Sequence, residues 1–84
     1  MSLSVLIADD HALMRRGVAQ VLELERDISL VGEASGGREA IEKTKSLGPD
    51  VVILDISMPD MSGIAVAQEI KRECPGTGIV ILTI

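Results

Sequence analysis

The sequence predicts an α/β fold in which an open parallel β-sheet carries helices on both faces. Two short apolar runs, residues 3–8 and 51–54, have the composition of strands that are buried on both sides of a sheet. Helix-length segments with amphipathic spacing separate these runs from each other and from two further strand-like runs. This alternation predicts right-handed crossovers and parallel strands.

The first strand is expected at residues 4–8, and an amphipathic helix is expected to follow it. The inner face of this helix should consist of apolar residues at helical spacing, namely Met14, Val18, Val21 and Leu22. Arg15 and Arg16 fall on the other side of the helix and are expected to be solvated.

A second strand and helix are expected in residues 28–47. Residues 28–34 alternate loosely in polarity, and the small residues 35–37 end that strand. Ser35 is a candidate cap for a helix over residues 38–47, which Gly48 and Pro49 should end. The inner stripe of this helix is expected to be Ala40, Ile41, Thr44 and Leu47.

The last part of the chain repeats the pattern. Ser62 is a good N-cap for a third helix, whose inner face should include Ala67, Ile70 and Cys74. Pro75 and Gly76 should end that helix, and residues 78–84 read as a fourth buried strand.

Length and composition describe one small domain with an aliphatic core. A chain of 84 residues buries only about 60% of its unfolded surface, so its core must be dense. Hydrophobic residues make up 46% of the chain, yet it contains no Phe, Tyr or Trp. The net charge of -5 argues against direct binding of nucleic acid phosphates, which requires a basic face.

Nothing in the sequence calls for a membrane or an oxidising compartment. The single cysteine, Cys74, cannot form an internal disulfide. No window reaches the roughly 18 apolar residues of a membrane span, and the start lacks the pattern of a secretory signal. A cytoplasmic location is therefore expected.

Acidic residues follow both of the most apolar strands. Asp9 and Asp10 follow the first run, and Asp55 follows the run at 51–54. Ligands of open α/β sheets bind at the carboxyl ends of the strands, so these acids are expected to meet in one crevice. The simpler alternative is that Asp55 only caps a turn. His11 is expected to be a surface residue outside the catalytic set, rather than a metal ligand or a phosphorelay histidine.

Three carboxylates in one crevice need a compensating charge, because each raises the proton affinity of the others. A set of oxygen ligands without thiols suits Mg²⁺ or Mn²⁺. A carboxylate beside such an ion can also attack phosphorus to form an acyl phosphate.

Three sequence motifs, in the right order along the chain, resemble the receiver domain of bacterial two-component response regulators. They are Val5-Leu6-Ile7-Ala8-Asp9-Asp10-His11, residues 54–63 with Asp55-Ile56-Ser57-Met58-Pro59, and Ile81-Leu82-Thr83. Residues 8–17 and 31–34 look like the subfamily with a LuxR-type helix-turn-helix output. The resemblance implies a flavodoxin-like sheet in strand order 2-1-3-4, with residues 1–84 forming a single, partial receiver domain.

The resemblance also implies a role for each site residue. Asp55 would accept a phosphoryl group from a phosphohistidine of a sensor histidine kinase. Asp10, Asp55 and the backbone carbonyl of Ser57 would hold Mg²⁺, and Asp9 would help through water. Thr83 would be the switch hydroxyl that turns to the new phosphoryl oxygens. DNA would be bound only through an output domain that lies beyond this chain.

Receivers of this family continue past the fourth strand through two more helices and a fifth strand, with a lysine that contacts the phosphoryl group. Lys43, Lys45 and Lys71 all lie on predicted helices and do not replace it. Ile84 would restrict access to the site. The fourth strand would then be an apolar edge, and we expect the fragment to self-associate through it.

Two other functional classes remain open from the sequence. One is a Mg²⁺-dependent phosphohydrolase, although Ser57 stands where a second acid would serve turnover. The other is a non-phosphorylatable interaction module. The receiver itself is not expected to be an enzyme.

Overall fold

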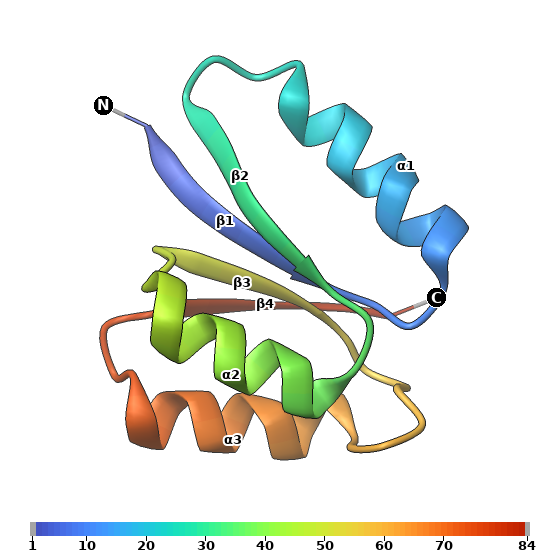
Figure 1. Cartoon of the computed structure of the whole chain (residues 1–84), viewed down its shortest axis with the longest axis vertical. Coiled ribbons are helices and arrows are strands. Elements are labelled where there is room, and N and C mark those ends of the chain that lie inside the picture. The colour runs from blue at the N-terminus through green and yellow to red at the C-terminus, as the bar shows by residue number, and fades with distance from the viewer. Residues whose placement is uncertain (1, 84) are drawn as a thin grey trace.

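The computed structural model describes residues 2–83, which form one four-stranded sheet with three helices (Figure 1). The elements are β1 Leu3–Ala8, α1 Ala12–Glu23, β2 Ile28–Ala34, α2 Gly37–Leu47, β3 Val51–Asp55, α3 Gly63–Glu73 and β4 Gly78–Leu82. All neighbouring strands are parallel and their order is β2-β1-β3-β4. The predicted fold class and strand order are confirmed.

The strand register brings the carboxyl ends of the strands to one edge of the sheet. Ala8, the last residue of β1, pairs with Leu54 on one side and Ala34 on the other. On the far side of β3, Asp55 pairs with Leu82 of β4. The residues that follow β1 and β3 therefore emerge side by side.

The two faces of the sheet are covered unequally. Helices α2 and α3 lie on one face and α1 alone lies on the other (Figure 1). The larger buried cluster fills the α2 and α3 side and contains Leu6, Ala8, Ala34, Ala40, Ile41, Val52, Leu54, Met58, Val66 and Ile70. The smaller cluster on the α1 side contains only Val5, Ile7 and Ala19 as fully buried residues.

Helix α1 packs along a narrower line than its apolar spacing predicted. Val18 and Leu22 are partly buried as expected, but Met14 is 39% exposed and Val21 is 62% exposed. The fully buried residue of α1 is Ala19, whose small side chain lets the helix approach the strands. The predictions for Met14 and Val21 were wrong because the single helix on this face buries only one side of its apolar stripe.

Helix α2 begins one residue earlier than predicted, and Ser35 does not cap it. Its N-cap is Gly36, which is extended and supplies no side-chain hydrogen bond. The amide and hydroxyl of Ser35 instead donate to Oε1 of Glu39, at 2.7 and 3.0 Å. The predicted inner stripe holds for Ala40, Ile41 and Thr44, whereas Leu47 at the end of the helix is 48% exposed.

The C-terminal elements match their predicted positions closely. Ser62 caps α3, because its Oγ accepts a hydrogen bond from the Ala65 amide at 3.1 Å. Strand β4 ends at Leu82, and the predicted contribution of Ile84 lies outside the described residues. As the predicted strand order requires, β4 is an edge strand; the expectation that it is fully buried is wrong, since Val80 is 48% exposed and Ile81 is 37% exposed. None of the helices in residues 2–83 has the length and hydropathy that crossing a membrane requires.

Candidate functional site

The three predicted carboxylates meet where β1 and β3 end. One ligand atom from each of Asp9, Asp10, His11 and Asp55 can be chosen so that all four lie within 4.8 Å of one another. Asp9 and Asp55 are buried and Asp10 is half-buried. The prediction that these acids share one crevice is confirmed.

Two oxygens of this cluster are buried without a hydrogen-bond partner. They are Oδ1 of Asp10 and Oδ2 of Asp55, and they are the buried side-chain N or O atoms of residues 2–83 that have none. A buried acceptor without a donor is costly, and the cost is higher for a charged group. Carboxylate oxygens gathered in this way are what a hard divalent cation such as Mg²⁺ would coordinate, so the residues fit the predicted ion.

His11 is exposed as predicted, but it also belongs to the cluster. Its Nδ1 lies 3.1 Å from Oδ1 of Asp9, 3.2 Å from Oδ1 of Asp10 and 3.7 Å from Oδ2 of Asp55. The backbone amide of His11 donates to the same Asp9 oxygen at 2.8 Å. The hydrogen bond to Asp9 and then the charge of Asp10 raise the pKa of His11. The view of His11 as a mere surface residue was therefore incomplete.

Arg15 is a neighbour of the acid cluster that the sequence pattern missed. Its Nη1 donates to the Asp9 carbonyl at 2.6 Å, and its Nε donates to Oε1 of Glu33 at 3.0 Å. Its side chain is only 17% exposed, so the expected solvated position is wrong for Arg15. Arg16 is about half exposed and also pairs with Glu33. The signal in the sequence was Glu33, an acid near the end of the second predicted strand, which the sheet register places beside Ile7.

The loop from Asp55 to α3 is closed by backbone contacts. The Ser57 amide donates to Oδ1 of Asp55 at 3.3 Å, and Ser57 forms an isolated antiparallel bridge with Ser62. The Gly63 amide donates to the Ile56 carbonyl at 2.8 Å. A Cβ on Gly63 would lie 2.7 Å from the Asp55 carbonyl oxygen, so the loop can close only with glycine there. Ser57 therefore lies next to the Asp55 side chain.

Thr83 follows the residue that pairs with Asp55. Leu82 pairs with Asp55 in the sheet and its carbonyl accepts from the Ile56 amide at 3.2 Å. Thr83 is exposed directly beyond it, at the same edge as the acids. This position is compatible with the expected switch hydroxyl, whose role stays a prediction.

The lysines of the described chain are engaged away from the acids. Lys43 donates to the Glu33 carbonyl at 2.5 Å, Lys45 pairs with Glu73 at 3.4 Å, and Lys71 donates to the Thr77 carbonyl at 2.7 Å. All three lie on α2 or α3, as predicted. Within residues 2–83, therefore, no lysine pairs with Asp9, Asp10 or Asp55.

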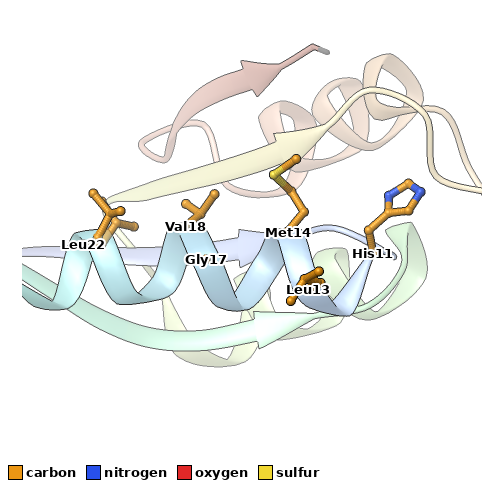
Figure 2. A pocket seen from close by; sticks show the side chains of 7 residues that line it. His11, Leu13, Met14, Gly17, Val18 and Leu22 are labelled. Atoms are coloured by element: carbon orange, nitrogen blue, oxygen red, sulfur yellow. The ribbon is translucent and has the colours of Figure 1, made fainter.

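An apolar groove of about 900 Å³ runs along α1 (Figure 2). It is lined by His11, Leu13, Met14, Gly17, Val18, Val21 and Leu22. Figure 2 shows His11 at one end of the row, beyond Met14. The other lining residues offer no charged or polar side chain, so the groove is not where an ion or a phosphoryl group would bind.

Known proteins resemble this chain over nearly all of its length. Residues 5–84 match the family model of the response regulator receiver domain. The response regulator protein VraR of Staphylococcus saprophyticus is 39% identical over 83 residues, which cover 99% of this chain and 40% of that protein. The chain therefore spans well under half the length of such curated relatives.

Solved structures of response regulators and their receiver domains share the fold of this chain. The response regulator domain of Thermotoga maritima CheB has a TM-score of 0.95 at 35% identity, covering 99% of this chain and 61% of that one. The receiver domain of NarL from Mycobacterium tuberculosis has a TM-score of 0.93 at 36% identity, covering 98% and 66%. RcsB from Salmonella enterica serovar Typhimurium, bound to promoter rprA with the phosphomimetic BeF3-, has a TM-score of 0.91 at 34% identity, covering 99% and 43%.

These matches agree with the observed fold and strand order. The chain belongs to the receiver domain family of two-component response regulators.

Proposed function

We propose that this chain is a phospho-accepting receiver that works in the cytoplasm, and that a sensor histidine kinase phosphorylates Asp55. The observation that carries the proposal is the pair of buried oxygens on Asp10 and Asp55 that have no hydrogen-bond partner. Asp10, Asp55 and the Ser57 carbonyl would hold Mg²⁺, with Asp9 acting through a water molecule; Mn²⁺ would serve as well.

The surroundings of Asp55 support a role as the nucleophile. Its Oδ1 accepts from the Ser57 amide, which fixes the carboxylate, while its Oδ2 is held by no hydrogen bond. The Asp55 carboxylate oxygen that does not hold the ion would attack phosphorus, so that a P–O bond forms while the P–N bond to the kinase histidine breaks and its electron pair returns to the imidazole nitrogen. Bound Mg²⁺ would offset the charge of the phosphoryl oxygens.

Thr83 would act after the transfer. A phosphoryl group adds about -1.5 to -2 charge, so a hydroxyl donor gains a charge-assisted hydrogen bond only in the phosphorylated state. The exposed position of Thr83, one residue beyond the partner of Asp55, leaves its side chain free to make that contact. Such a difference in contacts is what biases a two-state element.

The output would be DNA binding by a part of the protein outside residues 1–84. The solved RcsB chain is described as bound to promoter DNA in the presence of a phosphomimetic, and it is much longer than this chain. The net charge of -5 on this chain supports a division of labour in which the receiver does not itself bind DNA.

Acetyl phosphate can stand in for the kinase in a direct test. The chain is incubated with Mg²⁺ and acetyl phosphate, and the intact mass is measured for the wild type and for Asp55→Ala. A labile phosphoryl adduct on the wild type that Asp55→Ala lacks supports the proposal. Release of phosphate without an accumulated adduct would instead indicate the phosphohydrolase, and no reaction would indicate an interaction module without acceptor chemistry.

The 84-residue chain would also self-associate through β4. This strand hydrogen-bonds to β3 on one side only, and Val80 and Ile81 are exposed on it. An apolar strand edge without charge or proline is a template for pairing with a second chain. Light scattering after size-exclusion chromatography should show a dimer or larger species that Val80→Lys reduces; a stable wild-type monomer would contradict this.

A further inference from the structure

Helix α2 is capped by a residue from a distant loop. Its N-cap, Gly36, has no side chain, and the amides of the first turn need acceptors. Asp60 provides them: its Oδ1 accepts from the Gly37 amide at 2.9 Å and its Oδ2 accepts from the Arg38 amide at 3.1 Å. The cap thus joins α2 to the loop that follows β3.

The contact is shaped by two glycines at the start of α2. A Cβ on Gly36 would lie 3.2 Å from both carboxylate oxygens of Asp60. A Cβ on Gly37 would lie 2.6 Å from a methyl group of Val66 and 2.9 Å from Cβ of Met61. The helix terminus is therefore pressed against the loop and α3 with no room for side chains. These hydrogen bonds, first from Gly37 and then from Arg38, lower the pKa of Asp60.

Asp60 lies in the same short loop as a predicted metal ligand. Ser57 and Ser62 form the bridge that closes this loop, and Asp60 lies between them. Inside the loop, Met58 is buried in the larger core cluster and gives a second anchor. The position of the Ser57 carbonyl therefore depends on how both anchors hold the loop.

The same cap connects the loop to the other end of the acid cluster. Strand β2 leads into α2, and the Ala34 carbonyl at its end accepts from the Asp9 amide at 3.0 Å. A continuous path of contacts runs from Asp9 through Ala34 and the start of α2 to Asp60, and back along the chain to Asp55. The two strand ends that carry the acids are thus tied together a second time, beyond the pairing of β1 with β3.

We propose that Asp60 is a positioning residue for the acid site: by capping α2 it holds the loop after β3 in the arrangement that divalent-ion binding needs. The inference rests on the proposed function, because it presumes that the acids bind Mg²⁺. Asp60 itself binds no ion in this account. Loss of the cap should weaken Mg²⁺ binding although every ligand remains.

Asp50 offers a matched control at the opposite end of β3. Its exposed carboxylate also accepts two hydrogen bonds, from the amide and the hydroxyl of Ser4 at 2.9 and 3.0 Å. Asp50→Ala therefore removes the same charge and a similar pair of hydrogen bonds, but far from the acids. A simple effect of charge or stability would appear in both variants.

The test is calorimetric titration with Mg²⁺ at a temperature where far-UV circular dichroism shows every variant folded. Asp60→Ala should bind Mg²⁺ about 10-fold more weakly than the wild type, the lower end of the loss seen when outer-sphere support of a ligand is removed. Asp60→Asn keeps one acceptor oxygen for the cap and should fall between them. Asp50→Ala should bind like the wild type.

A metal-free readout accompanies the titration. Amide hydrogen exchange at Gly37 and Arg38 should accelerate in Asp60→Ala and remain slow in Asp50→Ala. Equal Mg²⁺ affinity in Asp60→Ala and Asp50→Ala would overturn the inference, and so would equal weakening in Asp60→Ala and Asp60→Asn, which would point to charge alone. If the wild type itself bound no Mg²⁺, the proposed function would fail first and the inference with it.

Discussion

The sheet face under α2 and α3 differs from the edge where β1 and β3 end in whether its buried polar groups have hydrogen-bond partners. On the packed face, the buried polar side chains are satisfied: the Thr44 hydroxyl donates to the Ala40 carbonyl at 2.7 Å, within a cluster of aliphatic residues. At the edge, buried oxygens of Asp10 and Asp55 have no hydrogen-bond partner. Packing on the sheet face stabilises the fold, whereas the carboxylates at the edge lower its stability until a cation binds there.

The largest expected effect comes from cutting into the packed face. Val66→Ala removes two methyl groups from a fully buried position on α3 and should lower the free energy of unfolding by about 2 kcal/mol. Val18→Ala is the matched change on α1, where the side chain is only partly buried, and should cost less than about 1 kcal/mol. Urea unfolding followed by far-UV circular dichroism measures both, and equal losses would contradict the asymmetry of the two faces.

At the edge the sign should reverse. Asp55→Asn removes one of three crowded negative charges, so we expect the metal-free protein to gain about 1 kcal/mol in unfolding free energy. Saturating Mg²⁺ should raise the melting temperature of the wild type much more than that of Asp55→Asn, since only the former keeps the full ligand set. A variant that is less stable than the wild type without metal would show that the acids are not strained.

The smallest expected effect concerns a satisfied carboxylate at the start of α2. Hydrogen bonds from the Ser35 amide, then from Lys43 and the Ser35 hydroxyl, lower the pKa of Glu39 to about 2. Because the pKa in the folded state lies below the ordinary value of 4.5, this stabilisation is complete above pH 4.5 and is lost as the pH falls toward 2. Solvent keeps it small, since the side chain is 43% exposed.

Unfolding free energies of the wild type and Glu39→Gln should therefore converge between pH 4.5 and about 2. Glu42→Gln, which removes the same charge from an exposed position of the same helix, is the control. A difference in unfolding free energy between the wild type and Glu39→Gln that stays constant through this pH range would contradict the lowered pKa of Glu39.

Periodicity and the placement of acids predicted most of the fold and the core of the site. Buried strands are recognisable as apolar runs. Acids that follow parallel strands must meet at one edge of the sheet, so the sequence alone predicted that Asp9, Asp10 and Asp55 lie together. These predictions need only short-range patterns, which can be read from the sequence, and the general geometry of parallel sheets.

The side chains that support the site were harder to predict because their partners are distant in the sequence. Arg15 falls on the polar side of α1, yet it reaches Glu33 on β2 and the Asp9 carbonyl. Ser35 has the right chemistry for a cap, but Asp60, from a loop more than 20 residues later, takes that place on α2. Capping rules consider only residues close to the helix start, so they cannot predict that a carboxylate brought there by tertiary packing will replace a nearby serine.

The most direct test of the central claim, that two strand ends share one divalent ion, is paramagnetic broadening by Mn²⁺ in an assigned ¹H–¹⁵N spectrum. We expect the amide signals of residues 9–11 and 55–57 to disappear together at low Mn²⁺, and excess Mg²⁺ to restore them. Broadening of only one strand end would contradict a shared site, and so would diffuse broadening that also reaches exposed acids such as Glu23 at the end of α1 and Asp27 in the loop before β2.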